Sequence, residues 1–217
     1  MEVGQGEGVH LKAGYKNYII DGGGKVDYNL GKKTLKPYFL KNGIGKLDGG
    51  FFTHNHTDHF KATCELSNEM PLQKAYFSVP YSSKLDELAS NLQSKSIRFL
   101  SAKNRLSLSE DCYIDVLWPL SSQTYDDTDE NGNSLILKIV SNGKSILMTG
   151  DITSEGEAER VEYYKGTNTL KCDSLKISHH GSRYSSSDEF IDAVSPSIAI
   201  IQVGQNTYGH PTAKVLE

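Results

Sequence analysis

Three of the seven histidines in the chain fall within six residues, in the heptapeptide THNHTDH that begins at Thr53. Imidazole nitrogens and a carboxylate suit zinc, manganese or iron as ligands. In an extended loop, His54 and His56 point to the same side and can share one ion. Asp58 and His59 follow where the chain turns, so they can face another ion. The motif therefore predicts a site for two divalent metal ions, with zinc as the expected metal and manganese or iron as alternatives.

Further candidates come directly after expected strands. Asp151 ends the string MTGD, His179 and His180 follow a strand that ends near residue 178, and the next strand leads to His210. A Gly-Asp turn alone is commonplace, but beside the histidine cluster it makes Asp151 the candidate for a carboxylate that bridges both ions. His10 stands apart in an early strand, and we interpret it as structural. Asp21 is expected to lie beneath the histidine loop and to orient a ligand without binding metal itself.

The order HxHxDH, Gly-Asp and a later histidine resembles the metallo-β-lactamase superfamily. Longer strings carry a closer resemblance, to the hydrolase domain of the ComEC/Rec2 family of DNA-internalisation competence proteins. These strings are VGQGE from Val3, IDGG from Ile20, NSL from Asn133, LMTGD from Leu147, LKISHHGS from Leu175 and YGHP from Tyr208. The resemblance spans nearly the whole chain. It departs from the family at Glu7, where Asp is more usual, and in the absence of a membrane channel.

The resemblance implies a single domain over residues 1–217 with an α/β (α+β) fold, a metallo-β-lactamase-like αββα sandwich of two mixed β-sheets flanked by helices. It also implies the ligands: His54 and His56 for the first ion, Asp58 and His59 for the second, and Asp151 as the bridge. The superfamily usually supplies a further histidine to the first ion from the segment before Gly-Asp. Because no histidine stands between His59 and His179, we expect one ion to be under-coordinated or weakly held.

The remaining roles depend on the histidines that follow the strands. We assign His179 to the metal, although spacing alone also allows His180 or His210. Adjacent residues of an extended chain face opposite sides, so His180 is assigned to the substrate, where it would donate a proton to the leaving group. Asp58 is expected to orient the attacking water and take its proton. The residues assigned to substrate binding are Ser182, Tyr208 and His210.

The elements that must carry these residues are β-rich in the first half and alternate between strand and helix in the second. Asn142-Gly143 predicts a hairpin turn. Ser154 with Glu157 predicts a capping box at a helix start, and Pro211 predicts the first turn of another helix. Strands are expected at 10–12, 17–20, 51–53, 97–100, 113–118, 135–140, 145–148, 174–178 and 198–203, and helices at 84–92, 154–164 and 187–194.

The composition limits the class of protein. A net charge of −4 provides no basic field that would capture nucleic acid non-specifically. Three widely spaced cysteines without a CxxC pair predict free thiols in a reducing compartment. The sequence shows neither a signal peptide nor a membrane segment, so as written the chain is expected in the cytoplasm. If it is part of a membrane competence protein, it is expected outside the membrane.

The leading functional hypothesis is a phosphodiesterase or nuclease that uses a hydroxide generated between two metal ions, with DNA as a candidate substrate. A second hypothesis is hydrolysis of a small molecule such as a lactone, thioester, β-lactam or cyclic nucleotide, which the acidic net charge favours. A third is a non-catalytic metal-binding module, which the intact HxHxDH motif disfavours. The fold alone does not choose among them.

Overall fold

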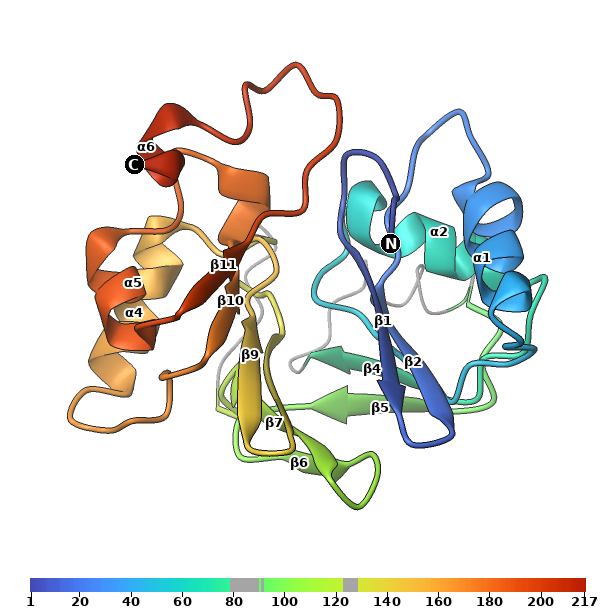
Figure 1. Cartoon of the computed structure of the whole chain (residues 1–217), viewed down its shortest axis with the longest axis horizontal. Coiled ribbons are helices and arrows are strands. Elements are labelled where there is room, and N and C mark those ends of the chain that lie inside the picture. The colour runs from blue at the N-terminus through green and yellow to red at the C-terminus, as the bar shows by residue number, and fades with distance from the viewer. Residues whose placement is uncertain (79–89, 91, 123–128) are drawn as a thin grey trace.

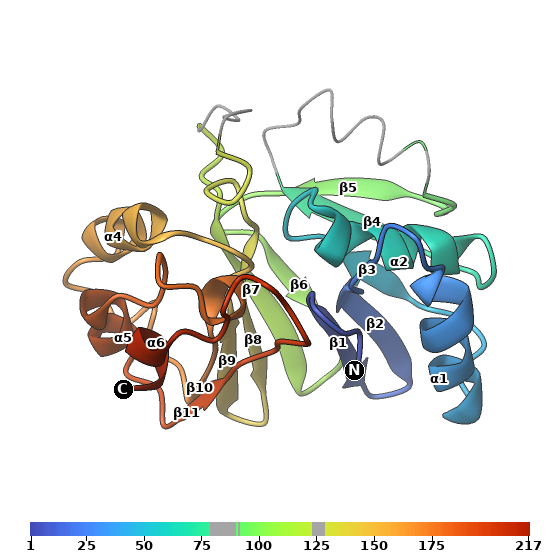
Figure 2. The same ribbon diagram turned by 90° about the horizontal axis from the view of Figure 1, so that it is seen from above.

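Two β-sheets pack face to face between two groups of helices in the computed structural model, which describes residues 1–78, 90, 92–122 and 129–217 (Figure 1). One group consists of α1 (Lys36–Lys41) and α2 (Thr57–Ser67), and the other of α4 (Ser154–Tyr163), α5 (Asp188–Val194) and α6 (Ala213–Leu216). Seen from above, the two groups lie on opposite outer sides of the sheets (Figure 2). The expected αββα sandwich is confirmed. Across the described ranges, no helix has the length and apolar character needed to cross a bilayer.

The first sheet has the strand order β1-β2-β3-β4-β5. Its strands are β1 (Gly8–Ala13), β2 (Lys16–Asp21), β3 (Gly49–Phe51), β4 (Ala75–Ser78) and β5 (Ile97–Leu100). β1 and β2 form an antiparallel hairpin, and β2 to β5 run parallel to one another. α2 covers the outer face, where its Phe60 packs against Phe52 and Phe77 in a buried cluster.

The second sheet has the order β11-β10-β9-β8-β7-β6. Its strands are β6 (Arg105–Ser107), β7 (Cys112–Trp118), β8 (Ile136–Ser141), β9 (Lys144–Met148), β10 (Ser174–Lys176) and β11 (Ile198–Ile200). β6 to β9 are antiparallel, whereas β9, β10 and β11 are parallel. The hairpin expected at Asn142-Gly143 joins β8 to β9, with Asn142 in the left-handed region at φ 49°.

The core between the sheets is built from alternating strand residues that face inward. From the first sheet, Ile20 and Phe51 contribute, and Phe51 stacks on Tyr76 with 4.6 Å between ring centroids. From the second sheet, Ile114 and Leu137 complete the same buried cluster. This packing fixes the two sheets relative to each other and therefore fixes the loops at their ends.

Several expected element boundaries were wrong. β10 ends at Lys176, earlier than expected, because the chain soon turns into the short helical turn η2 (Ser178–Gly181). β11 also ends earlier than expected, at Ile200. α6 begins at Ala213, so Pro211 precedes the helix instead of opening it. The helix expected at 84–92 falls almost entirely outside the described residues.

The capping box predicted at the start of α4 was also wrong. The residue before the helix is Thr153, and the helix runs from Ser154. Glu157 is fully buried and accepts hydrogen bonds from the backbone N–H groups of Ser186 and Ser187, at 2.6 and 2.8 Å. A tertiary partner some thirty residues later in the chain therefore replaces the local cap.

Candidate metal centre

The candidate residues meet at one edge of the sandwich because the strands that lead to them end there. β3 ends at Phe51 and the chain then reaches His54, while β9 ends at Met148 and the chain reaches Asp151. β2 and β3 are parallel, as are β9 and β10, so the carboxyl ends of each pair lie together. The first turn of α2 adds Asp58 and His59.

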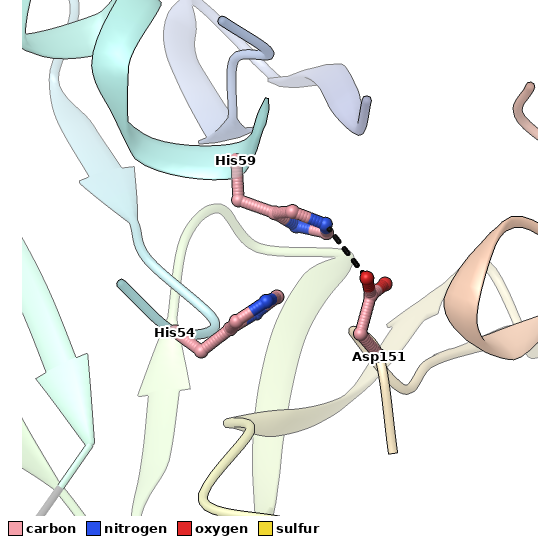
Figure 3. A group of neighbouring side chains, drawn as sticks. All are labelled: His54, His59 and Asp151. Carbon is pink, nitrogen blue, oxygen red and sulfur yellow. Dashed lines mark ion pairs between the residues drawn. The ribbon is translucent and has the colours of Figure 1, made fainter. Parts of the chain in front are cut away.

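Asp151 lies at the centre of the cluster. Its Oδ2 is 3.2 Å from His59 Nε2 and 3.6 Å from His180 Nε2. His54 completes a group in which one ligand atom of each residue lies within 4.8 Å of the others, and Figure 3 shows both rings directed toward the carboxylate. Asp58 forms a second such group with His59 and His180, and its Oδ2 is 3.5 Å from His180 Nε2. Asp151 is therefore close to His59, as the bridging role requires.

In His54, His59 and His180, the ring nitrogen Nδ1 is held by a partner outside the cluster, a different one for each residue. We call Nδ1 the outer nitrogen of these rings and Nε2 the inner nitrogen. His54 Nδ1 is 3.0 Å from the Thr53 hydroxyl, and His59 Nδ1 is 2.8 Å from Asp21 Oδ2. His180 Nδ1 is 2.9 Å from the carbonyl oxygen of Gln202. Such outer partners fix the tautomer and the ring orientation of histidines that bind metals, and they leave the inner nitrogen free to act as a ligand. Asp21 thus supports the site as expected.

The inner atoms of the cluster have the features of a cation site. His59 Nε2, His180 Nε2 and Asp151 Oδ1 are buried and have no hydrogen-bond partner in the described part of the chain. Buried polar atoms are normally paired, so unpaired nitrogen and oxygen atoms that face one another call for an ion or a water. The nitrogen and carboxylate donors match zinc, manganese or iron.

The electrostatics of the cluster also suit a divalent cation. Burial opposes a charge on His59, but Asp151 and Asp21 on either side outweigh it and hold the pKa of His59 well above its usual value. Burial lowers the pKa of His54, and His59 lowers it further. Burial would raise the pKa of Asp58, yet the contact with His180 and the charge of His59 bring it to about 2. An ionised carboxylate and a neutral imidazole are the forms that bind metal, so a bound cation would take the place of the proton on His59.

His56 stands at the edge of this cluster. Its Nδ1 is 3.0 Å from His54 Nε2, so the two histidines of HxH share one side as expected. Its other nitrogen, Nε2, is 2.9 Å from the carboxylate of Glu130. Glu130 therefore orients His56 in the way that Asp21 orients His59. With Asp151, the pair could give the first ion three protein ligands and an open position.

The two adjacent histidines of η2 are arranged differently from the extended pair expected. Both lie in the left-handed region, with φ 50° for His179 and 54° for His180. Such backbone is costly for residues other than glycine and is typical of functional sites. His180 is buried inside the cluster, whereas the His179 side chain is 27% exposed and its Nε2 is 4.0 Å from Asp151 Oδ2. The geometry favours His180 over His179 as a ligand, although the assignment made from the sequence stays untested.

The residues assigned to the substrate divide into two groups. His210 lies beside His179, with ring centroids 5.8 Å apart, and Tyr208 lies beside His210 at the same distance. These rings lead from the cluster to the surface. Ser182 is buried, and its hydroxyl accepts a hydrogen bond from the Tyr184 N–H, which favours a structural role.

Relatives of known name match the chain, although no protein-family model does. ComE operon protein 3 of Bacillus subtilis is 31% identical over 237 aligned positions, which span the whole chain and 30% of that protein. Competence protein ComA of Neisseria gonorrhoeae is 43% identical over 88 residues, which span 40% of the chain and 12% of that protein. The chain thus spans less than a third of the length of these relatives. The resemblance to competence proteins is confirmed.

A solved structure decides the fold. The metallo-β-lactamase fold protein YhfI of Bacillus subtilis superposes with a TM-score of 0.59, covering 97% of this chain and 84% of that protein at 11% sequence identity. This chain has the metallo-β-lactamase fold.

In this metallo-β-lactamase fold, the sequence located the cluster and its support Asp21 but missed the other residues that hold the histidine rings. Glu130 and Gln202 hold ring nitrogens of His56 and His180, although each lies far from its partner in the sequence. No local pattern marks either residue. Thr53 immediately precedes His54, so its place in the motif was a signal that could have been used.

Proposed function

We propose that the chain is a metal-dependent hydrolase that cleaves phosphodiesters with two divalent ions, zinc being the expected metal and manganese or iron alternatives. One observation carries the proposal: His54, His59 and His180, each held at its outer nitrogen, converge with their inner nitrogens on two carboxylates. A structural site would be closed by four ligands, whereas a catalytic site keeps open positions. When bound, the ions act as Lewis acids and lower the pKa of a water so that it becomes a nucleophile at neutral pH.

The geometry supports a ligand set that revises one assignment. The first ion would be held by His54, His56 and Asp151, and the second by Asp58, His59, His180 and the shared Asp151. His180 takes the place given to His179 because it is buried, its Nδ1 is held by Gln202, and its Nε2 lies 3.5 and 3.6 Å from the carboxylates of Asp58 and Asp151. His179 moves to the substrate side.

The chain's own residues would then divide the proton transfers. Asp58, ionised because its pKa lies near 2, can accept the proton of the attacking water at a carboxylate oxygen. His179 stands at the mouth of the cluster beside His210, where it can give a proton to the leaving oxygen. Burial lowers the pKa of His179, which makes its protonated form a stronger acid but leaves less of that form at neutral pH. Tyr208 can contact the departing group.

Phosphodiester chemistry is proposed because the relatives include a competence protein by name, and DNA is the candidate substrate. The test is a screen of the metal-loaded protein with bis-p-nitrophenyl phosphate, single-stranded DNA and nitrocefin. Hydrolysis of both phosphodiesters, abolished by a chelator and restored by zinc or manganese, supports the proposal. Turnover of nitrocefin alone would assign the chain to small-molecule hydrolysis instead.

A further inference from the structure

A surface groove opens directly onto Asp58. It has a volume of about 1060 Å³ and is lined by parts of three loops, namely residues 2–5, residues 24–34 and residues 205–208, together with Thr57 and Asp58. All three loops lie on the same side of the molecule in Figure 1. The volume is at the upper limit of sites for single small molecules, about 300–1,000 Å³. The Asp58 groove therefore has room for a ligand that extends beyond the reacting group.

The wall formed by residues 205–208 is ordered by one side chain. The Asn206 amide donates to the carbonyl oxygens of Gly204 and His210, both at 2.9 Å. Its oxygen accepts the N–H groups of Tyr208 and His210, at 3.0 and 3.1 Å. Tyr208 is nevertheless 72% exposed. The loop thus presents an aromatic ring to the groove on a fixed backbone, beside the rings that lead into the metal centre.

The opposite wall carries a second exposed ring. Tyr28 is 39% exposed and lies on a tight turn, where its N–H donates to the carbonyl of Lys25. The Lys33 ammonium stands 4.8 Å from the centroid of the Tyr28 ring. The Lys61 ammonium, which also pairs with Glu65, reaches the Tyr28 carbonyl. One lysine ammonium therefore lies against the ring and a second lies beside the backbone carbonyl of the same residue. The charged residues that line the groove itself are Glu2, Lys25 and Asp58.

We propose that the Asp58 groove binds the single-stranded nucleotide chain beside the scissile phosphodiester, with Tyr28 and Tyr208 as stacking surfaces for its bases. Aromatic rings with nearby lysines bind unpaired bases and phosphates without reading sequence. A duplex already stacks its base faces internally, so it cannot offer them to the two tyrosines. The inference rests on the phosphodiesterase activity proposed above and adds a substrate subsite to it.

The test measures binding and hydrolysis separately. The metal-loaded protein is titrated into a fluorescently labelled single-stranded phosphorothioate oligothymidylate, which resists cleavage, and anisotropy is followed. Tyr28→Ala and Tyr208→Ala should each weaken binding at least about fivefold, the lower end of the loss when alanine replaces a base-stacking ring. Tyr15→Ala is the matched control, because Tyr15 is 102% exposed in the β1–β2 turn and does not line the groove. It should bind as tightly as the unaltered protein.

Two further measurements distinguish failure of the groove assignment from failure of the proposed phosphodiesterase function. In both groove variants, kcat/KM for an oligonucleotide should fall more than kcat/KM for bis-p-nitrophenyl phosphate, which has no neighbouring nucleotides to occupy the groove. An unlabelled duplex of equal length should compete poorly with the labelled strand. The groove assignment is overturned if the three tyrosine variants bind alike or if the duplex competes equally. If binding depends on Tyr28 and Tyr208 but no phosphodiester is hydrolysed, the proposed function fails and the groove stands.

Discussion

The partner of each outer histidine nitrogen decides what the inner nitrogen can do. Where a hydroxyl, a carboxylate or a carbonyl holds the outer nitrogen, the ring cannot turn and the inner nitrogen is presented to the centre. His180 has this support from Gln202. For His179, Nδ1 is buried without a hydrogen-bond partner among the described residues. A ring with less support suits a group that must move with a substrate better than it suits a ligand.

Alanine variants of the two adjacent histidines should separate these roles. We expect His180→Ala to weaken metal binding about 10-fold or more, since even changes to outer partners cost 10–100-fold. His179→Ala should keep both ions and lose about 100-fold in kcat, the usual scale of a positioned acid. Elemental analysis after dialysis, with turnover of bis-p-nitrophenyl phosphate, measures both.

His10→Ala is the control for these variants. The nitrogens of His10 contact Tyr38 and Asn17, away from the centre, so its loss should change neither metal content nor rate. If His179→Ala loses the metal while His180→Ala retains it, His179 is the ligand, as assigned from the sequence. The proposal that His180 takes its place would then be wrong.

Asp58→Asn should nearly abolish turnover while leaving the protein folded. An amide cannot take the proton of the attacking water, so we expect a fall in kcat of about 10²–10⁴-fold. Asp188→Asn is a matched control, because Asp188 also occupies the first turn of a helix but lies outside the cluster. Circular dichroism of both variants should match the unaltered protein. Similar rates for the two variants would remove Asp58 from the mechanism.

The sequence predicted the centre of the site better than its surroundings. His54, His56, Asp58 and His59 were predictable because their ligand types are crowded into one short motif. Which of two adjacent histidines faces the centre was not predictable, since it depends on left-handed backbone at both residues. Such backbone is set by the packing of η2 against distant segments, which leaves no local sequence pattern.

Among the secondary-structure elements too, features set by local pattern were predicted and features set by distant contacts were not. The strand from Ile97 to Leu100 was predicted at its observed bounds, because its hydrophobic pattern is local. The capping box at α4 failed because Glu157 has a better partner than its own helix. It accepts three hydrogen bonds from Ser186 and Ser187, including one from the Ser187 hydroxyl at 2.9 Å. This contact ties α4 to the loop between η2 and α5.

Glu157→Gln tests how much the hydrogen bonds from Ser186 and Ser187 to Glu157 stabilise the protein. One side-chain oxygen would become an N–H donor that faces backbone donors, so we expect a loss of about 1–3 kcal/mol in the free energy of unfolding. Urea denaturation at neutral pH measures it. Glu162→Gln, on the exposed side of the same helix, should change stability by less than about 0.5 kcal/mol. Equal effects would mean that the Glu157 contacts contribute little.

At the scale of the whole molecule, the buried ion pair between Lys176 and Glu7 joins the two sheets beside the centre. Lys176, at the end of β10, donates to Glu7 at 2.6 Å, and their side chains are 2% and 0% exposed. The Glu7 carboxylate also lies within 4.8 Å of ligand atoms of Asp21 and His59. The backbone N–H of Glu7 donates a hydrogen bond to the Asp58 carbonyl oxygen. The pair therefore sets the spacing between the part of the site on α2 and the part on η2.

Lys176→Met should destabilise the protein strongly, because it leaves a buried carboxylate unpaired beside Asp21. Breaking a buried pair by removing one partner costs about 3–5 kcal/mol. Adding Glu7→Gln to the same chain removes the stranded charge, so the double variant should recover much of that loss. Urea denaturation of the single and double variants measures the coupling. A double variant less stable than Lys176→Met would show that the charge of Glu7 is stabilised by other groups.

Removal of metal should lower the stability of the whole fold, because the ligands come from both halves of the sandwich. His54 and His59 follow the first sheet, and Asp151 and His180 follow the second. A ligand that binds only the folded state stabilises it by about 2.7 kcal/mol at a hundredfold excess over Kd. Chelation should therefore lower Tm by about 5–10 °C for a chain of this size, and zinc should restore it. In the doubly substituted His54→Ala, His180→Ala variant, the chelator should have no effect. An equal fall in both proteins would mean that the chelator acts elsewhere than at this centre.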